Sequence, residues 1–473
     1  MIRSFIVKRG WIVSFAASAL ALVAAQAAAA PLSLTAEEVA RRARDTSFEV
    51  RARADERDAA DEAAEQARAG FLPRLSGTAR YTRVSNLTIP TLGNLVVAPT
   101  PGPVDPATTP LLAVPVGFPV VVDQYLAQGT LQIPLSDYFL RLPQAHAAAT
   151  ANARAAALTE QAARLRVATD ARVAYYSWVR ASLATGIARQ GLEQARGHLA
   201  DVKTAAGAGT ASRADVLRVE SQVASAELLL IHALNQAAIA ERQLRTAMHD
   251  PSGQPYEIGE TIDQPLAGAI AAVTGEAALE SLRVEAATQR LEPRAIVEGA
   301  GAAREAAAAA LSAGLPRLDA VGNAIYANPN PRIFPQAAVY KGTWDASVQV
   351  SWAFTDLPGA MAARRQGRAR ASALEAERSQ LLDAIGLEVT GAAHALSEAR
   401  AAIETTRRGV GSAEESYRVR RVLFQNGRAT SVELTDAETE LTRARLELVN
   451  AQIDLRQANA KLIHALGRDA GAK

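Results

Sequence analysis

The sequence contains no cysteine, which excludes disulfides, cysteine-ligated zinc, thiol catalysis and a lipid anchor on cysteine. Aromatic residues are also scarce, with 4 Trp, 9 Tyr and 9 Phe among 473 residues. Hydrophobic residues nevertheless make up 49% of the chain, and many of them are Ala, which is typical of long, closely packed helices. The formal net charge of +2 provides no basic surface for a nucleic-acid partner.

The long hydrophobic run of the chain lies at its N-terminus. Arg3, Lys8 and Arg9 precede an apolar run over residues 11–25, and small residues follow through Ala30. This order predicts a secretory signal peptide over residues 1–30, with an uncleaved membrane-anchor helix as the alternative. No later stretch is apolar without interruption for the length of a membrane-spanning helix, so none is expected there. An exported chain without cysteine fits the bacterial periplasm or outer membrane.

Two halves of the chain repeat each other. Residues 209–216 (GTASRADV) correspond to residues 427–434 (GRATSVEL), and the LPRL of residues 72–75 recurs at residues 315–318. A repeat of this length indicates a duplication rather than a solenoid of short units. We therefore predict one structural repeat over residues 31–250, followed by an inter-repeat segment and a second repeat over residues 251–473.

Each repeat is expected to contain two strands and a long helical hairpin. In the first repeat the strands are predicted at about 74–84 and 126–136, and the hairpin at about 142–249. In the second repeat the strands are predicted at about 316–327 and 343–354, and the hairpin at about 358–467.

The hairpin segments carry heptads, in which apolar residues recur every seven positions. One run reaches from Leu382 to Phe424, and another comprises Leu434, Leu441, Leu448, Leu455 and Leu462. A sustained repeat of seven imposes left-handed supercoiling, so we predict coiled-coil hairpins. The helix predicted before Gln425 would be roughly 100 Å long at 1.5 Å per residue, about three times the thickness of a bilayer core. Because it is also rich in Arg and Glu, it must stand in water.

In the predicted strands, apolar residues recur at every second position rather than every seventh. In residues 344–354 the even positions are apolar or aromatic, and the odd positions are polar or small. Strands of about ten residues with aromatic ends suit a transmembrane β-barrel. A single such strand more often belongs to a soluble sandwich, but four of them, paired as hairpins and fused to heptad helices in an exported chain, favour the barrel. Four strands cannot close a barrel, so a membrane-spanning form would have to pool strands from several copies. The aromatic residues expected to face lipid at the membrane boundaries are Tyr81, Tyr326, Trp344 and Trp352.

With this duplicated layout, the LPRL segments and the tip motif Gly-x-x-[Ser/Thr]-x-x-[Asp/Glu]-[Val/Leu], the chain resembles the outer membrane factors, the TolC-like family of channel-tunnel proteins. The resemblance covers nearly all of the chain after residue 30. It implies a mainly α-helical fold with a small β part: a homotrimer with a twelve-stranded barrel in outer-membrane lipid, four strands per chain, and a helical α-barrel in the periplasm. It also implies a passive exit duct that works with a periplasmic adaptor protein and an inner-membrane transporter, in efflux or type I secretion.

The resemblance implies site residues at the two hairpin tips. The acidic residues expected to line the pore entrance are Glu433, Asp436 and Asp215. The tip residues expected to dock an adaptor are Gly209, Thr210, Ser212, Gly427, Arg428 and Thr430. The residues alone leave another interpretation open, because Thr430 and Glu433 fit a helix capping box, as do Ser212 and Asp215. Ala429 stands where family members often carry a gating Arg, and the Pro-rich loop over residues 86–124 is longer than the family pattern.

No enzyme motif, metal-ligand spacing or cofactor motif is present in the sequence. None of the six His residues has a second His two to four positions away, and neither a phosphate-binding loop nor a nucleophile elbow occurs. The sequence therefore predicts a protein that is not an enzyme. The competing prediction is a periplasmic coiled-coil scaffold that never inserts into a membrane.

Overall fold

A computed structural model describes residues 31–85, 93–105, 107–115, 120–264, 266, 270 and 275–471. The predicted signal peptide over residues 1–30 and parts of the Pro-rich loop lie outside the described residues. The chain divides into two compact units. The first comprises the described residues up to Ala54, with Thr159–Glu292 and the residues from Leu381 on; the second comprises Asp55–Leu158 and Pro293–Gln380. The fold is mainly helical with a small β part, which confirms the predicted fold class.

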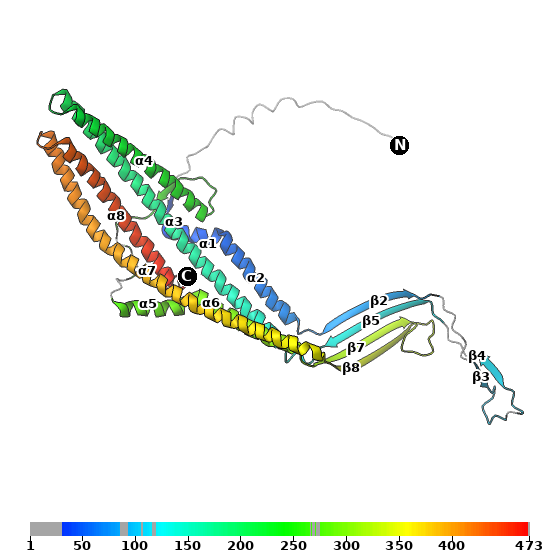
Figure 1. Ribbon diagram of the computed structural model, residues 1–473. Coiled ribbons are helices and arrows are strands. Elements are labelled where there is room, and N and C mark those ends of the chain that lie inside the picture. Colours follow the sequence, from blue (N-terminus) through cyan, green and yellow to red (C-terminus); the bar gives the residue numbers. More distant parts are fainter. Residues whose placement is uncertain are drawn as a thin grey trace, which may run out of the picture. The chain divides into compact units, whose positions relative to one another are not determined.

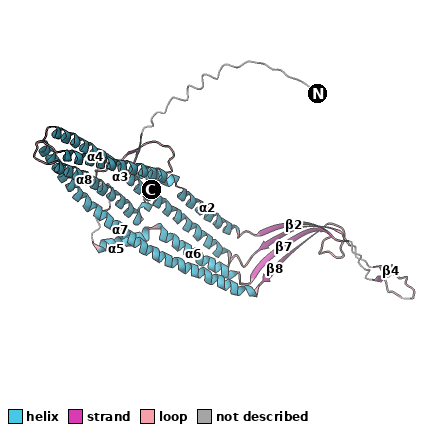
Figure 2. Cartoon of the chain, turned by 45° about the horizontal axis from the view of Figure 1, so that its top comes forward, coloured by secondary structure: helices cyan, strands magenta, loops and turns pink. Residues whose placement is uncertain are grey.

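Two helical hairpins dominate the first unit, in which α3 is followed by α4 and α7 by α8 (Figures 1 and 2). The main helices of this unit are α1 (Ala36–Thr46), α3 (Leu142–Gly207), α4 (Arg213–Ala247), α5 (Glu276–Gln289), α7 (Leu357–Gln425) and α8 (Ser431–Ala465). A short 3-10 helix, η2 (Arg468–Gly471), follows α8. The long helices form because Ala, Leu, Arg and Glu predominate, all of which are strong helix formers.

The core of the first unit contains two main hydrophobic clusters. One joins α1, α3, the end of α4 and α8, with Val39, Tyr175, Trp178 and Leu244 at its centre. The other joins α5, α7 and α8, and contains Leu279, Val389, Leu396 and Leu462. Small Ala residues at intervening positions allow the helix backbones to approach closely.

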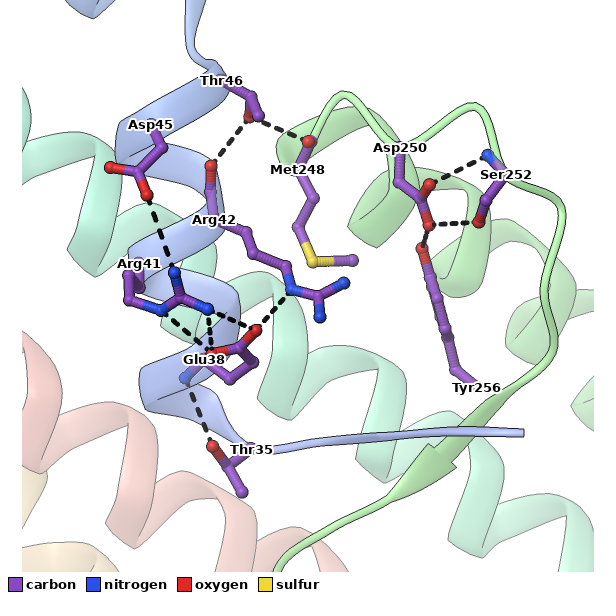
Figure 3. A network of polar contacts seen from close by, with 10 residues as sticks. All are labelled: Thr35, Glu38, Arg41, Arg42, Asp45, Thr46, Met248, Asp250, Ser252 and Tyr256. Atoms are coloured by element: carbon purple, nitrogen blue, oxygen red, sulfur yellow. Dashed lines mark hydrogen bonds and ion pairs between the residues drawn. The ribbon is translucent and has the colours of Figure 1, made fainter. Parts of the chain in front are cut away.

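A parallel pair of short strands, β1 (Leu32–Leu34) and β6 (Tyr256–Ile258), lies beside this core. Figure 3 shows the polar contacts around it. Thr35 caps α1 by accepting a hydrogen bond from the backbone N–H of Glu38 at 3.2 Å. At the other end of α1, the Thr46 hydroxyl donates to the Met248 carbonyl at 2.8 Å, which ties α1 to the end of α4. The Tyr256 hydroxyl donates to Asp250 and fixes the loop that enters β6.

The second unit is built around a four-stranded antiparallel sheet, together with α2 (Phe48–Ala69), α6 (Leu291–Ser312) and the adjoining parts of α3 and α7. The strands are β2 (Arg74–Arg83), β5 (Asp123–Ile133), β7 (Arg317–Asn328) and β8 (Lys341–Ser351), and they lie in the order β2-β5-β7-β8. β2 and β8 are therefore the two edges of the sheet. A separate hairpin of β3 (Asn94–Val97) and β4 (Leu112–Pro115) lies within the long loop between β2 and β5.

Two strands differ from their predicted bounds by more than one residue. β5 begins at Asp123 and ends at Ile133, each three residues before the predicted bound, and it ends there because Pro134 has no N–H with which to continue the ladder. β8 likewise ends at Ser351 rather than at 354, and the chain turns into the 3-10 helix η1 (Phe354–Asp356). Trp352 therefore lies beyond the strand, where its indole N–H donates to the Gly314 carbonyl at 3.1 Å.

Candidate functional site

The two hairpin tips have the same backbone turn. Gly209 and Gly427 both adopt a positive φ, of 81° and 69°, which glycine reaches without steric strain. The N–H of Thr210 donates to the Ala205 carbonyl at 2.9 Å, and the N–H of Arg428 donates to the Leu423 carbonyl at 2.8 Å. This pairing, with the glycine N–H bonded to the carbonyl three residues earlier, is a Schellman motif that ends α3 and α7.

The helix after each tip begins with a capping box. Ser212 accepts from the N–H of Asp215 at 3.1 Å, and the Asp215 carboxylate accepts from the Ser212 N–H at 3.0 Å. Thr430 and Glu433 make the same reciprocal pair at the start of α8, at 3.3 Å and 2.9 Å. The hydrogen bonds from Ser212 lower the pKa of the Asp215 carboxyl. The pKa of the Glu433 carboxyl is also lowered, mainly by the hydrogen bonds from Thr430 and to a smaller extent by the charge of Arg420.

The acidic residues predicted at the pore entrance therefore occupy two different settings. Glu433 forms an ion pair with Arg420 of α7 at 2.6 Å in addition to its capping bonds. Asp436, one turn further along α8, is exposed and forms no ion pair among the described residues. Both remain candidates for pore lining, but Glu433 has a capping role that the structure displays directly. No sequence pattern indicated Arg420, because it lies on α7 and meets Glu433 of α8 only in the folded hairpin.

A buried polar cluster lies further along the same hairpins, and sequence reasoning missed it. His198 of α3 is 3% exposed, and its Nδ1 lies 3.3 Å from a carboxylate oxygen of Glu438 in α8. Its Nε2 lies 3.2 Å from the hydroxyl of Ser431, and the Phe424 ring packs edge-on against the imidazole. This His198 cluster links α3 to the beginning of α8. No local spacing could have revealed it, because His198 and Glu438 are far apart in the sequence.

We expect His198→Ala to destabilise the protein, because the buried Glu438 carboxylate would lose its partner. Leaving a buried polar group unsatisfied costs about 1–3 kcal/mol, and more when the group is charged. The melting temperature of the purified protein, followed by helical circular dichroism, measures the loss. His198→Gln keeps a hydrogen-bonding side chain and serves as the matched control, so equal melting of the two variants would contradict a role for this contact.

The sheet of the second unit has two different faces. In register, Gly77, Gly129, Ala324 and Trp344 form one row across the four strands. Along most of its length that face carries apolar or aromatic side chains or glycine, and polar residues occur on it only at one end, where Arg83 pairs with Asp123 and where Asn328 lies. Its large apolar residues are exposed: Trp344 is 80%, Val348 67% and Leu75 78% exposed. The opposite face is mostly polar. It includes Thr130, Gln128 and Asn323, which hydrogen-bond to one another.

Aromatic side chains gather at both ends of the sheet. Among the predicted boundary residues, Tyr81 and Tyr326 lie near the C-terminal ends of β2 and β7. Tyr326 stacks on Tyr340, and tilted ring contacts join Tyr340 to Tyr125 and Tyr125 to Tyr81. Trp344 lies on the apolar face, and Trp352 packs on Phe354 at the helical end, with ring centroids 4.3 Å apart. The sequence prediction missed Tyr125 and Tyr340. Tyr125 lies one residue before the strand predicted at 126–136, and Tyr340 lies in the loop just before β8.

The helix α4 carries a second exposed apolar surface. Its outward stripe consists of Leu217, Leu228, Ile231 and Ile239, each more than half exposed. These positions share one helix face, since their spacings approximate whole turns. By length and composition alone α4 could cross a membrane, although its apolar residues are interrupted by polar ones. A stripe bordered by polar residues also fits a surface that another helix covers.

Comparisons with known proteins place these features in context. Residues 39–248 and 281–468 match the family model described as outer membrane efflux protein. A membrane protein from Pseudomonas aeruginosa has a similar structure, with a TM-score of 0.73 at 18% identity over 92% of this chain and 91% of that one. The CmeC outer membrane channel of Campylobacter jejuni has a TM-score of 0.73 at 13% identity, covering 91% of this chain and 85% of that one.

The MtrE outer membrane channel of Neisseria gonorrhoeae, in its open state, has a TM-score of 0.71 at 17% identity, covering 91% of this chain and 88% of that one. Likeness at such low identity establishes a shared fold. No curated protein sequence gives a significant match.

Proposed function

Because the chain belongs to the outer membrane efflux protein family, we propose that three copies form the exit duct of a tripartite efflux or type I secretion system. The chain is an outer-membrane efflux channel rather than an enzyme. In the proposed duct, the inner-membrane transporter supplies the energy, the periplasmic adaptor docks at the hairpin tips, and this chain provides the path across the outer membrane. Removal of residues 1–30 during export is part of the same proposal.

The proposed trimer rests mainly on one observation: the sheet has one apolar face and two open edges. Unpaired backbone N–H and C=O groups cannot face lipid, so β2 and β8 must each find a partner strand in the membrane. Pairing β8 of one copy with β2 of the next closes a barrel when three copies meet. A barrel of twelve strands is wide enough for an aqueous lumen, and the polar face would line it.

The stripe on α4 supports the same assembly. Leu217, Leu228 and Ile231 would stay in water in a single copy, whereas a neighbouring hairpin in a trimer would cover them. The tip residues Gly209, Thr210, Ser212, Gly427, Arg428 and Thr430 would remain uncovered at the far end of the hairpins. They are the proposed docking surface for the adaptor.

A periplasmic scaffold is the competing function, and membrane insertion separates the two. An exit duct should fractionate with the outer membrane, migrate as a trimer that dissociates on heating in SDS, and conduct ions in planar bilayers. A soluble trimer in periplasmic extracts that does not conduct would support the scaffold instead.

The proposed gate gives a sharper test. We expect wild-type channels to prefer cations and to be blocked by a multivalent cation from the periplasmic side only. Three copies would place six carboxylates of Glu433 and Asp436 at the entrance, and rings of carboxylates concentrate cations. The lowered pKa of Glu433 keeps that residue ionised at neutral pH. Single-channel recordings of Glu433→Ala/Asp436→Ala should show that the block is lost and that cation preference falls.

The control for this experiment separates charge from helix capping. Glu433→Gln/Asp436→Asn removes both charges, but it keeps a side chain that can accept the capping hydrogen bond of Thr430. It should lose the block as the alanine variant does, while trimer assembly stays intact. If the isosteric variant were still blocked, the acids would have no gating role and their capping function alone would remain.

A further inference from the structure

The two edges of the sheet continue into two helices of opposite charge. α2 ends at Ala69, just before β2 begins at Arg74, and α7 begins at Leu357, just after β8 ends at Ser351. Within the second unit, α2 and β2 lie along one side, and β8 and the start of α7 lie along the other (Figures 1 and 2). Closing a barrel by pairing β8 of one copy with β2 of the next therefore brings the first turns of α7 beside the last turns of a neighbouring α2.

The part of α2 in this unit is acidic. Residues 55–69 contain six acidic residues and two Arg, and all six acids are exposed: Asp55, Glu56, Asp58, Asp61, Glu62 and Glu65. Asp55, Asp58, Glu62 and Glu65 fall on one face, by the spacing of helical turns. The partly covered positions of the same helix, Ala60, Ala64 and Ala67, lie on the opposite face, which packs within this chain. The acidic face thus points away from the chain's own helices.

The start of α7 is basic. Residues 357–370 contain four Arg and no acidic residue: Arg364, Arg365, Arg368 and Arg370. Arg364 and Arg368 border a hollow of about 320 Å³ beside α6, together with Arg304 and Glu375, which form an ion pair. Arg365 and Arg370 are exposed, and neither forms an ion pair among the residues that the structure describes. On α2, Asp55 and Glu62 are likewise without an ion pair in the described chain.

The opposite charges lie at matching distances from the sheet. At 1.5 Å per residue, Glu62 is about 10 Å from the end of α2, and Arg365 is about 12 Å from the start of α7. Asp58 and Arg368 are both about 16 Å from those helix ends. The two helices also run in opposite directions relative to the sheet, so two successive acids on one can meet two successive bases on the other.

We propose that the acidic face of α2 and the basic start of α7 in the next copy form an electrostatic seam, repeated at each of the three junctions of the trimer. The seam rests on the proposed trimeric function and adds to it the surface by which neighbours recognise one another. A single exposed ion pair contributes little, but complementary charge excludes wrong pairings and fixes register. The seam would therefore align the helices before the edge strands join.

Charge reversal tests the seam. Arg365→Glu/Arg368→Glu/Arg370→Glu and, separately, Asp55→Lys/Asp58→Lys/Glu62→Lys would place like charges at every junction. Each variant should lose the trimer band in SDS gels at sample temperatures where the wild type keeps it. High salt during reconstitution should restore part of the trimer band, because salt screens exposed charges. The chain that carries both triple changes should recover the trimer. The control is Arg407→Glu/Arg408→Glu, a pair of exposed arginines further along α7, which should behave as the wild type does.

A cross-link gives an independent measurement. Because the chain has no cysteine, Glu62→Cys/Arg365→Cys introduces the only two thiols. Mild oxidation in the outer membrane should produce covalent dimers and trimers, whereas either single change should not yield covalent trimers. The seam is wrong if the trimer forms, the paired cysteines do not cross-link, and neither the charge reversals nor their combination changes the stability of the trimer. If the wild type forms no trimer, the proposed function fails instead.

Discussion

Replacing Ala346 by Arg should prevent insertion of the channel into the outer membrane. Ala346 lies midway along β8 on the apolar face of the sheet, opposite Gly322 in the neighbouring strand. An arginine at the bilayer midplane on the lipid-facing side of a barrel costs about 2–4 kcal/mol per chain, and a trimer carries the cost three times. Outer-membrane fractionation and heat-modifiable migration in SDS measure the loss.

The adjacent residue supplies the control for this prediction. Ser347 points to the polar face, so Ser347→Arg adds the same side chain at nearly the same depth but toward the proposed lumen. It should insert normally and change ion selectivity. Equal insertion of the two variants would mean that the faces of the sheet are not divided between lipid and water. Val350 is a weaker choice, because it lies near the end of β8, where the cost of a charge falls toward that at the interface.

The second large effect is expected in the helical core. Leu462 of α8 is fully buried and packs in the cluster that contains Leu279, Val389 and Leu396. Leu462→Asp would remove this packing, at about 2–5 kcal/mol for a large-to-small change, and would also bury a carboxyl group without a partner. We expect loss of cooperative thermal unfolding, as measured by circular dichroism and calorimetry.

Two controls accompany the change at Leu462. Arg443→Ala changes an exposed residue of the same helix and should stay within about 0.5 kcal/mol. Leu448→Asp changes a heptad residue that is only half-buried in the single chain, so its effect should be intermediate. Unchanged melting of Leu462→Asp would contradict the packing of this cluster.

The heptad pattern predicted the long helices correctly, but it predicted less completely which heptad residues are buried. Leu434, Leu441 and Leu462 are buried as their spacing predicts, but Leu448 and Leu455 are only partly covered. A heptad repeat identifies which residues lie on the same packing face of a helix, but it does not say which other helix covers each part of that face. In an assembly of several copies, some of that cover can come from another chain.

Alternation predicted the four strands of the sheet, while their ends depended on local chemistry. Pro134 ends β5, and the turn after Ser351 removes Trp352 from β8. The ends of β5 and β8 do not follow from the alternation of apolar and polar residues, because that alternation describes only the interior of a strand. The alternation did identify the apolar face itself, since Leu318 is paired with Val350 and Leu75 with Leu131 in the register.

The polar contacts of the candidate site were the least predictable part. The capping boxes of Ser212 and Thr430 were visible as local patterns, because both partners lie within four residues. Arg420 and the His198 cluster were not, since they join residues from different helices. Such contacts depend on how the helices are stacked, which the linear pattern does not contain.

The two open edges of the sheet have a genetic consequence. In a barrel that closes only when every copy supplies both β2 and β8, one defective copy leaves two junctions unsealed. Cells that express a damaged allele beside the intact gene would build mostly mixed assemblies, because a complete ring requires every member to be sound. Alleles that disrupt an edge strand but still allow the helices to associate should therefore be dominant over the wild type, whereas alleles that abolish folding should be recessive.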